Sequence, residues 1–148
     1  MNKQGATKDE IVEFMESAFP QNPVTVVSLT DRGARVRLAV DEGALRPGGT
    51  ISGPTMMAVA DAAIYTAIFG ELGLVALAVT TQMSINFLRR PDGGLALLAD
   101  CSLLKVGKKL VVGEVTVYSE GQEEPVAHAV GTYALPPRSF TEVGNARP

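Results

Sequence analysis

The spacing of apolar residues changes along the chain and predicts the order of its secondary structure. Apolar positions between Ile11 and Ala18 recur at helical spacing, which predicts a short helix over residues 7–18. Thr7 is placed to cap this helix, and Pro20 and Pro23 end it. Residues 1–23 are therefore interpreted as an N-terminal helix and a linker.

A hairpin is predicted next. Residues 24–30 and 34–40 have the composition of strands, and the Asp-Arg-Gly at 31–33 is turn chemistry. In the second strand, apolar residues alternate with Arg35 and Arg37, so one face is buried and the other is wet. The segment 41–53 is predicted to be a loop.

The most apolar stretch of the chain runs from Met56 to Phe69, within a long helix predicted over residues 54–72. Pro54 suits the start of this helix, Gly70 and Gly73 mark its far end, and Asp61 and Glu71 are its only charges. A helix that is apolar nearly all round is surrounded by protein. The stretch from Met56 to Phe69 is shorter than the ~20 residues that a membrane-spanning helix needs, and it carries Asp61. We therefore interpret it as a buried helix.

Four more strands are predicted, with short links that make them mostly antiparallel. They cover residues 76–88, 95–106, 109–118 and 126–135, and the tail 136–148 is expected to be loose. A six-stranded antiparallel sheet needs one face covered, and helix 54–72 is the only long apolar element. The prediction is a single α+β domain over residues 1–148, with the sheet wrapped around that helix.

The composition and charge of the chain argue against several kinds of binding partner. The 148 residues carry a net charge of −3 and a pI near 5.1, which argues against nucleic acid. Cys101 is the only cysteine and no Cys/His cluster exists, so neither a disulfide nor a metal site is expected. The first ten residues do not resemble a signal peptide, and a cytoplasmic location is expected, with no membrane partner.

Three segments carry a resemblance to a known family. The segment from Gly49 to Asp61, GTISGPTMMAVAD, resembles a G-x-x-H-G-G stretch that runs into a helix with a catalytic Asp. The segments AVTTQMSINFLR, from Ala78, and VAHAVGTY, from Val126, resemble the strand after that helix and the last strand. Together they resemble the hotdog-fold thioesterases, specifically the PaaI-like, phenylacetate-pathway acyl-CoA thioesterases, over residues 24–135.

The resemblance implies a hotdog fold, an acyl-CoA substrate and no separate cofactor. It implies that Asp61 is catalytic and that the Gly53 amide is the oxyanion donor. The sequence departs from the family pattern at three positions: the His falls at Ser52, the second Gly at Pro54 and an upstream Asn at Arg46.

The residues themselves support both candidates. A carboxylate among apolar neighbours is costly to desolvate, so Asp61 is either a base or nucleophile for acyl transfer or a buried Asp that bonds a backbone or hydroxyl group. The N–H of Gly53 lies at a helix N-terminus, where the dipole favours an oxyanion. The alternative is a plain helix start, with Ser52 or Gly53 as the cap.

The spacing of the two candidates predicts an assembly. Asp61 follows Gly53 by eight residues, which is about 12 Å along a helix. One thioester carbon cannot contact both groups of the same helix. If both act, they come from different subunits, so a homodimer with two shared sites is predicted. Further assembly to a homotetramer is expected.

Polar residues on the following strand are candidates to bind water or substrate. Alignment with the family places Thr80 near the attacking water, and Thr81 and Gln82 lie beside it. Ordinary strand propensity and cross-strand bonding also explain them. Ser52 either bonds the thioester carbonyl or caps the helix, and capping is the simpler interpretation.

Basic residues at strand ends are candidates to hold the coenzyme A phosphates. They are Arg89, Arg90, Lys105, Lys108 and Lys109, and solvated turn charge is the alternative for each. Met56, Met57 and Tyr65 are candidates to line an acyl pocket, although Met on a buried helix is often core. His128 and Cys101 are interpreted as surface or packing residues.

The leading functional hypothesis is hydrolysis of an acyl-CoA thioester by Asp61 of one subunit and the Gly53 amide of its partner. The alternative is a non-catalytic hotdog module that binds acyl-CoA or another apolar ligand. A hotdog hydratase is disfavoured, because that group resembles this chain but carries a His five residues after the Asp, where this chain has Thr66.

Overall fold

The computed structural model describes residues 5–41 and 45–137, and their secondary structure follows the predicted order. The elements are α1 (Lys8–Ala18), β1 (Val24–Thr30), β2 (Gly33–Leu38), β3 (Leu45–Arg46), β4 (Thr50–Ile51), α2 (Gly53–Leu72), β5 (Val79–Phe87), β6 (Leu97–Val106), β7 (Leu110–Ser119) and β8 (Ala127–Ala134). One prediction was wrong: the segment 41–53 is not all loop, because β3 and β4 pair as a short hairpin. Most of the tail predicted to be loose, from residue 138 on, lies outside the described residues.

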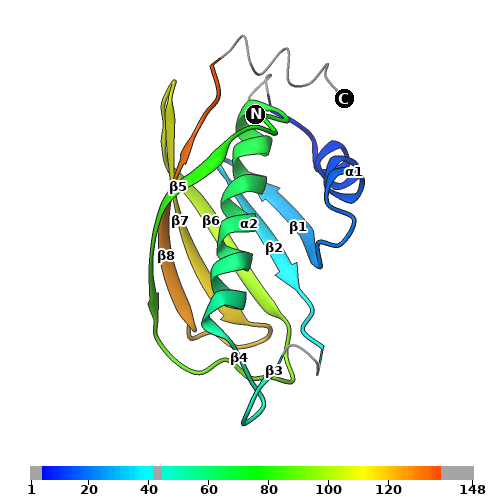
Figure 1. Cartoon of the computed structure of the whole chain (residues 1–148), viewed down its shortest axis with the longest axis vertical. Helices are drawn as coiled ribbons and strands as arrows, with labels where there is room; N and C mark the ends of the chain where they lie inside the picture. Colours follow the sequence, from blue (N-terminus) through cyan, green and yellow to red (C-terminus); the bar gives the residue numbers. More distant parts are fainter. Residues whose placement is uncertain (1–4, 42–44, 138–148) are drawn as a thin grey trace.

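The six long strands form one antiparallel sheet in the order β1-β2-β6-β7-β8-β5. The predicted antiparallel sheet around a long helix, the hotdog arrangement, is thereby confirmed (Figure 1). However, β5 and β6 follow each other in the chain without being neighbours, because β7 and β8 lie between them. This places β5 at an edge of the sheet, paired with β8 alone.

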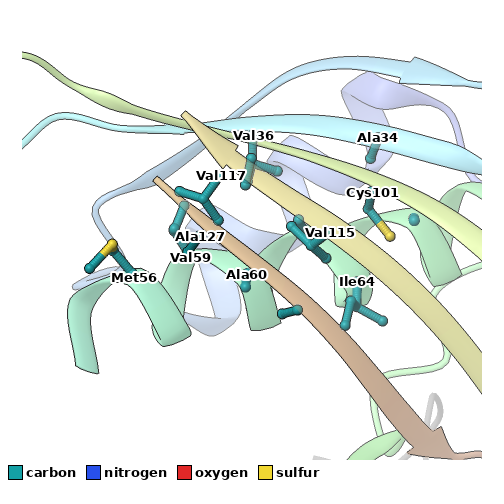
Figure 2. Close-up of a cluster of buried hydrophobic side chains, with 14 of the residues drawn as sticks. Ala34, Val36, Met56, Val59, Ala60, Ile64, Cys101, Val115, Val117 and Ala127 are labelled. Carbon is teal, nitrogen blue, oxygen red and sulfur yellow. The ribbon is translucent and has the colours of Figure 1, made fainter. Parts of the chain in front are cut away.

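The core lies between α2 and the sheet. Val59, Ala60 and Ile64 of α2 are fully buried and point toward strand residues such as Val115 and Val117 (Figure 2). This burial removes apolar surface from water and fixes α2 along the sheet.

The close approach of α2 to the sheet depends on glycine. A Cβ at Gly131 would lie 2.7 Å from Ile64 Cδ1, and one at Gly113 would lie 3.3 Å from Ile64 Cγ2. The two strand positions therefore make room for a branched side chain of the helix.

Helix α1 is fixed to the C-terminal half of α2. The predicted cap is present: the Glu10 N–H donates to Thr7 Oγ1, and the Thr7 N–H donates to Glu10 Oε1. Ile11 and Met15 pack with Phe69 in a second apolar cluster. The Ala6 N–H also donates to the Phe69 carbonyl at 2.9 Å.

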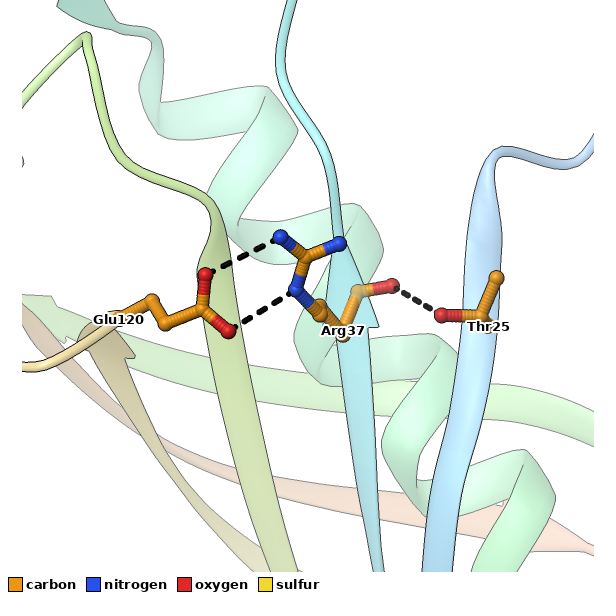
Figure 3. Close-up of polar contacts among 3 residues, drawn as sticks. All are labelled: Thr25, Arg37 and Glu120. Atoms are coloured by element: carbon orange, nitrogen blue, oxygen red, sulfur yellow. Dashed lines mark hydrogen bonds and ion pairs between the residues drawn. The ribbon is translucent and has the colours of Figure 1, made fainter.

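The outer face of β2 is polar, as its alternation predicted. Arg35 forms two hydrogen bonds to the Asp100 carboxylate. Arg37 forms two hydrogen bonds to the Glu120 carboxylate, each 3.0 Å long (Figure 3). The Thr25 hydroxyl donates to the Arg37 carbonyl, which ties β1 to the same array. These pairs are exposed, so they fix geometry more than they add stability.

One stripe of α2 is not covered by the chain's own sheet. Met57 is 38% exposed, Pro54 and Ala58 are exposed, and Asp61 and Tyr65 are partly exposed. The prediction of a helix surrounded by protein therefore holds for only part of its circumference within one chain. By length and composition alone, α2 also meets the criteria for a membrane-spanning helix.

Candidate active site

Asp61 lies near the middle of α2, and one of its carboxylate oxygens is held by two hydroxyl groups. The Thr80 hydroxyl donates to Asp61 Oδ1 at 2.6 Å, and the Tyr133 hydroxyl donates to the same oxygen at 2.7 Å. Oδ2 accepts no hydrogen bond from the described residues. Every buried side-chain oxygen of the described residues has a hydrogen-bond partner. Because Oδ2 has none, it is not buried and is open to solvent. The carboxylate is thus oriented and still has a free oxygen.

Tyr133, on β8, was not a candidate from the sequence. Its side chain is 2% exposed, and burial, together with the nearby Asp61 charge, raises the pKa of its phenol. Burial also raises the pKa of Tyr65, whose ring stacks on Tyr133 with centroids 6.0 Å apart. The Tyr133 phenol therefore stays protonated and remains a donor to Asp61. The strand period was the available signal, because Ala127, Ala129 and Tyr133 all lie on the buried face.

The three candidates on β5 separate into different roles. The pairing of β5 with β8 shifts between Thr80 and Gln82, so Thr81 is an extra residue at a β-bulge. The Thr81 hydroxyl donates to the Thr132 carbonyl, and the Gln82 side-chain amide donates to Ser84 Oγ. Only Thr80 of the three has a hydrogen bond to Asp61.

Gly53 begins α2, and Ser52 caps it. Ser52 Oγ accepts from the Thr55 N–H at 3.3 Å and lies 2.9 Å from Thr55 Oγ1, so the serine in the family's His position serves the helix start. The N–H groups of a first helical turn have no acceptor within the helix, and Pro54 has no N–H to offer. A Cβ at Gly53 would lie 3.2 Å from Phe87 Cζ, so the glycine is packed against the end of β5.

Asp61 and Gly53 line different cavities of the same chain. Asp61 lines a cavity of about 940 Å³ that runs along the uncovered stripe of α2. Gly53 lines a smaller cavity, of about 360 Å³, beside Phe87 and Arg90. The structure therefore places the two groups at opposite ends of β5, with Asp61 at Thr80 and Gly53 at Phe87.

The basic candidates are also divided between the two ends of the sheet. Val79 and Leu110 both pair with Ala134, so the turn that carries Lys108 and Lys109 lies toward the start of β5. Arg89 and Arg90 follow the end of β5. Within one chain they do not form the single phosphate-binding edge that the sequence suggested.

The two arginines differ in their surroundings. The Arg89 Nε–H donates to the Pro125 carbonyl at 2.8 Å, and the guanidinium pairs with Glu124. Both arginines line the smaller cavity beside Gly53, but the Arg89 guanidinium is already engaged by Glu124. Arg90 is thus the better placed of the two to meet a ligand at that helix end.

Other candidates fall outside the site or at its margin. Met57 lines neither cavity, whereas Met56 lines the smaller one and Tyr65 the larger one. His128 pairs with Glu114 at 2.9 Å between β7 and β8, and burial raises the pKa of Cys101 to about 12. Within residues 5–41 and 45–137, no group of three or more His, Cys, Asp or Glu side chains is placed to hold a metal ion.

The sequence of the central helix and the strands that follow it matches a known family. The family model described as thioesterase superfamily matches residues 48–126, which include Gly53, Asp61 and the whole of β5. The chain belongs to the thioesterase superfamily. The fold and the family that the sequence predicted are thereby confirmed.

Solved structures of this superfamily resemble the chain over nearly its whole length. A proposed thioesterase from Silicibacter sp. is 41% identical, with a TM-score of 0.82 over 93% of this chain and 99% of that one. The Escherichia coli PaaI protein of the phenylacetic acid degradation operon is 23% identical, with a TM-score of 0.69 over 86% and 92%. Zebrafish thioesterase superfamily member 2 is 20% identical, with a TM-score of 0.77 over 89% and 100%. No curated protein sequence matches the chain.

Proposed function

We propose that this thioesterase-superfamily protein hydrolyses acyl-CoA thioesters to a free acid and coenzyme A. The observation that carries the proposal is the Asp61 carboxylate, which Thr80 and Tyr133 hold at one oxygen while the other is open beside a large apolar cavity. A fixed carboxylate with one free oxygen suits either a general base or a nucleophile.

In the general-base route, Asp61 Oδ2 takes a proton from a water molecule. The water oxygen attacks the thioester carbonyl carbon, and the Gly53 N–H of the partner subunit stabilises the oxyanion. The intermediate collapses, the C–S bond breaks, and the sulfur of coenzyme A receives the proton. In the nucleophilic route Oδ2 attacks the carbonyl carbon, the C–S bond breaks and the coenzyme A thiolate leaves, so that an anhydride forms with Asp61. Water then hydrolyses the anhydride to the free acid and the Asp61 carboxylate, and the released proton goes to the thiolate. Thr80 and Tyr133 are positioning residues in both routes.

The edge strand β5 supports the proposed shared site. It is nine residues long, contains no charge and no proline, and pairs on one side only. Such an edge is a template for a strand of a second molecule. Large apolar residues flank the edge and are exposed: Leu77 at 50%, Val79 at 57%, Phe87 at 49% and Leu88 at 48%. We propose that two copies of the chain pair through β5 as a homodimer.

An antiparallel pairing of β5 with its own copy has a direct chemical consequence. The start of one strand lies beside the end of the other, so Asp61 and Thr80 of one subunit approach the Gly53 end of its partner. The same pairing moves the Lys108 and Lys109 turn toward the partner's Arg90, which offers two sources of charge for phosphates. Pairing dimers into a homotetramer remains part of the proposal.

Thiol release from a panel of acyl-CoA thioesters tests the function. We expect turnover by the wild type and a loss of about 100-fold or more in kcat for Asp61→Asn, with an unchanged melting temperature. Arg35→Gln is the matched control, because Arg35 lies on the outer face of the sheet, away from both cavities. Full activity of Asp61→Asn would exclude the mechanism.

One observation favours a second candidate, a non-catalytic acyl-CoA-binding module. Ser52 stands where the family has a histidine, and its side chain is engaged with Thr55 at the helix start. Absence of thiol release from every thioester of the panel, together with measurable binding of a thioether analogue of acyl-CoA, would support the binding module instead.

A further inference from the structure

The larger cavity continues past Asp61 to the N-terminal helix α1. Its lining includes Tyr65 from the next turn of α2 and Met15 and Phe19 from α1 and its C-terminal end. Asp61 and Tyr65 are four residues apart, about 6 Å along the helix axis, so the wall from the carboxylate to α1 is short and continuous. α1 is therefore part of the cavity that contains the candidate catalytic group.

The two ends of this cavity differ in polarity. Toward α1 the lining is apolar, with Met15, Phe19, Tyr65 and Ala76. Among its other polar side chains, Tyr133 lies at Asp61 and Thr55 at the start of α2, and Asp41 also lines the cavity. Asn22 is the polar residue beside Phe19, and its Oδ1 already accepts from the Val24 N–H. An apolar group that enters beside Asp61 gains most by extending toward α1, because apolar surface is removed from water there.

The aromatic residues of the chain gather at this end. The sequence has eight aromatic residues, three Tyr and five Phe, and five of them form one run of ring contacts: Phe14, Phe19, Phe69, Tyr65 and Tyr133. Phe19 contacts Phe14 and Tyr65 edge to face, with centroids 6.3 and 6.2 Å away. It nevertheless remains 43% exposed. A large ring held in place and left partly uncovered on a cavity wall offers a contact surface to an apolar ligand.

We infer that α1 forms the distal wall of an acyl-binding subsite, so that the protein prefers thioesters of apolar acyl groups large enough to reach Phe19. The acyl carbonyl lies at Asp61, and the far end of the acyl group lies against Met15, Phe19 and Tyr65. An aryl group or a medium-length alkyl chain has this chemistry, whereas acetyl is too short. The inference rests on the proposed function.

Substrate selectivity of Phe19→Ala tests the inference. We measure kcat/KM with acetyl-CoA, octanoyl-CoA and phenylacetyl-CoA, and we expect the octanoyl-to-acetyl or phenylacetyl-to-acetyl ratio to fall about tenfold, as for other lost contacts in an apolar pocket. The larger fall of the two tells whether the subsite favours a chain or a ring. Leu104→Ala is the matched control: Leu104 is also a large apolar side chain that is exposed, at 54%, and it lines neither cavity. The same ratios in the wild type and both variants would overturn the inference.

A binding measurement separates this inference from the proposed function. Asp61→Asn protein is titrated with coenzyme A and with its S-octyl and S-(2-phenylethyl) thioethers, which cannot be hydrolysed. If the wild type releases no thiol, the proposed hydrolysis fails, but tighter binding of either thioether that is lost in Asp61→Asn/Phe19→Ala still supports the subsite. Equal affinity for coenzyme A and both thioethers would refute it.

Discussion

A shared active site predicts that two inactive variants restore each other. In Asp61→Asn the candidate base is lost, and in Gly53→Pro the candidate oxyanion donor is lost. Proline is acceptable at the first position of a helix, and the extended backbone of Ser52, with ψ 157°, suits a residue before proline. A Cβ at position 53 meets the far end of the Phe87 side chain, 3.2 Å from Cζ. Gly53→Pro is therefore expected to fold.

The magnitude follows from the geometry. Loss of one oxyanion donor costs about 100- to 1,000-fold in kcat, and loss of a general base costs a comparable factor. In the heterodimer, the intact Asp61 of the Gly53→Pro chain meets the intact Gly53 of the Asp61→Asn chain, and the other site carries both defects. One of two sites is intact, so the heterodimer should have about half the wild-type kcat per dimer.

The assay uses two differently tagged variants that are co-expressed and purified over both tags in sequence. Each homodimer, purified in the same way from matched co-expression of one variant, gives the baseline. Thiol release by the heterodimer is then compared with both homodimers and with doubly tagged wild type. A doubly tagged heterodimer no more active than its parents would refute the shared site, because sites within one chain would each keep one defect.

Three further variants test other parts of the structure. Tyr133→Phe removes one of the two donors to Asp61 Oδ1, and a hydrogen bond to a charged group is worth about 1.5 kcal/mol, so we expect about a tenfold lower kcat with unchanged KM in steady-state kinetics. A lower melting temperature with unchanged kcat would instead mark Tyr133 as structural. Gly131→Ala places a Cβ against Ile64 and should destabilise the fold by about 1–3 kcal/mol in urea unfolding. Ile64→Val should recover part of that loss in the double variant, and an additive double variant would contradict the steric explanation. Burial raises the pKa of Cys101 to about 12, so the thiol keeps its proton in the folded state, whereas in the unfolded chain it loses the proton above pH ~8.5. Above that pH the unfolded state binds fewer protons than the folded state, so the free energy of unfolding falls as pH rises. Between pH ~8.5 and ~10 the wild type should therefore lose up to about 1.4 kcal/mol per pH unit more than Cys101→Ala, and parallel curves would refute this.

The elements and their order could be predicted because they depend on local patterns. Period-two alternation and the capping residue Thr7 placed β2 and the start of α1 within a residue or two. The strand order could not be obtained in the same way. The short link after Phe87 carries turn residues, yet it leads from the edge strand β5 to β6 across two other strands. Such pairing depends on contacts between distant strands, which no local pattern encodes.

The candidate site was predicted in part for a related reason. A lone carboxylate in an apolar helix and a Gly-Pro helix start are visible in one segment, so Asp61 and Gly53 could be singled out. Tyr133 is 72 residues from Asp61 in the sequence, and no neighbouring residue indicates that its hydroxyl donates to a carboxylate. The predicted phosphate-binding group was based on charge alone, and the sheet register places Arg90 and Lys108 at opposite ends of β5.

A single chain leaves two surfaces uncovered, a stripe of α2 and the edge of β5, and one proposed interface would cover both. The exposed stripe of α2 carries Asp61 and Tyr65, and the unpaired edge of β5 carries no charge to prevent strand addition. If the chain acted alone, its candidate base and its candidate oxyanion donor would open into different cavities. A second copy placed along β5 removes both difficulties at once, because it covers the apolar edge and brings the missing helix N-terminus to the aspartate. The proposed dimer would therefore account for both the apolar edge and the separation of the candidate catalytic groups. A variant whose β5 cannot pair with a second copy should fold as a monomer and be inactive.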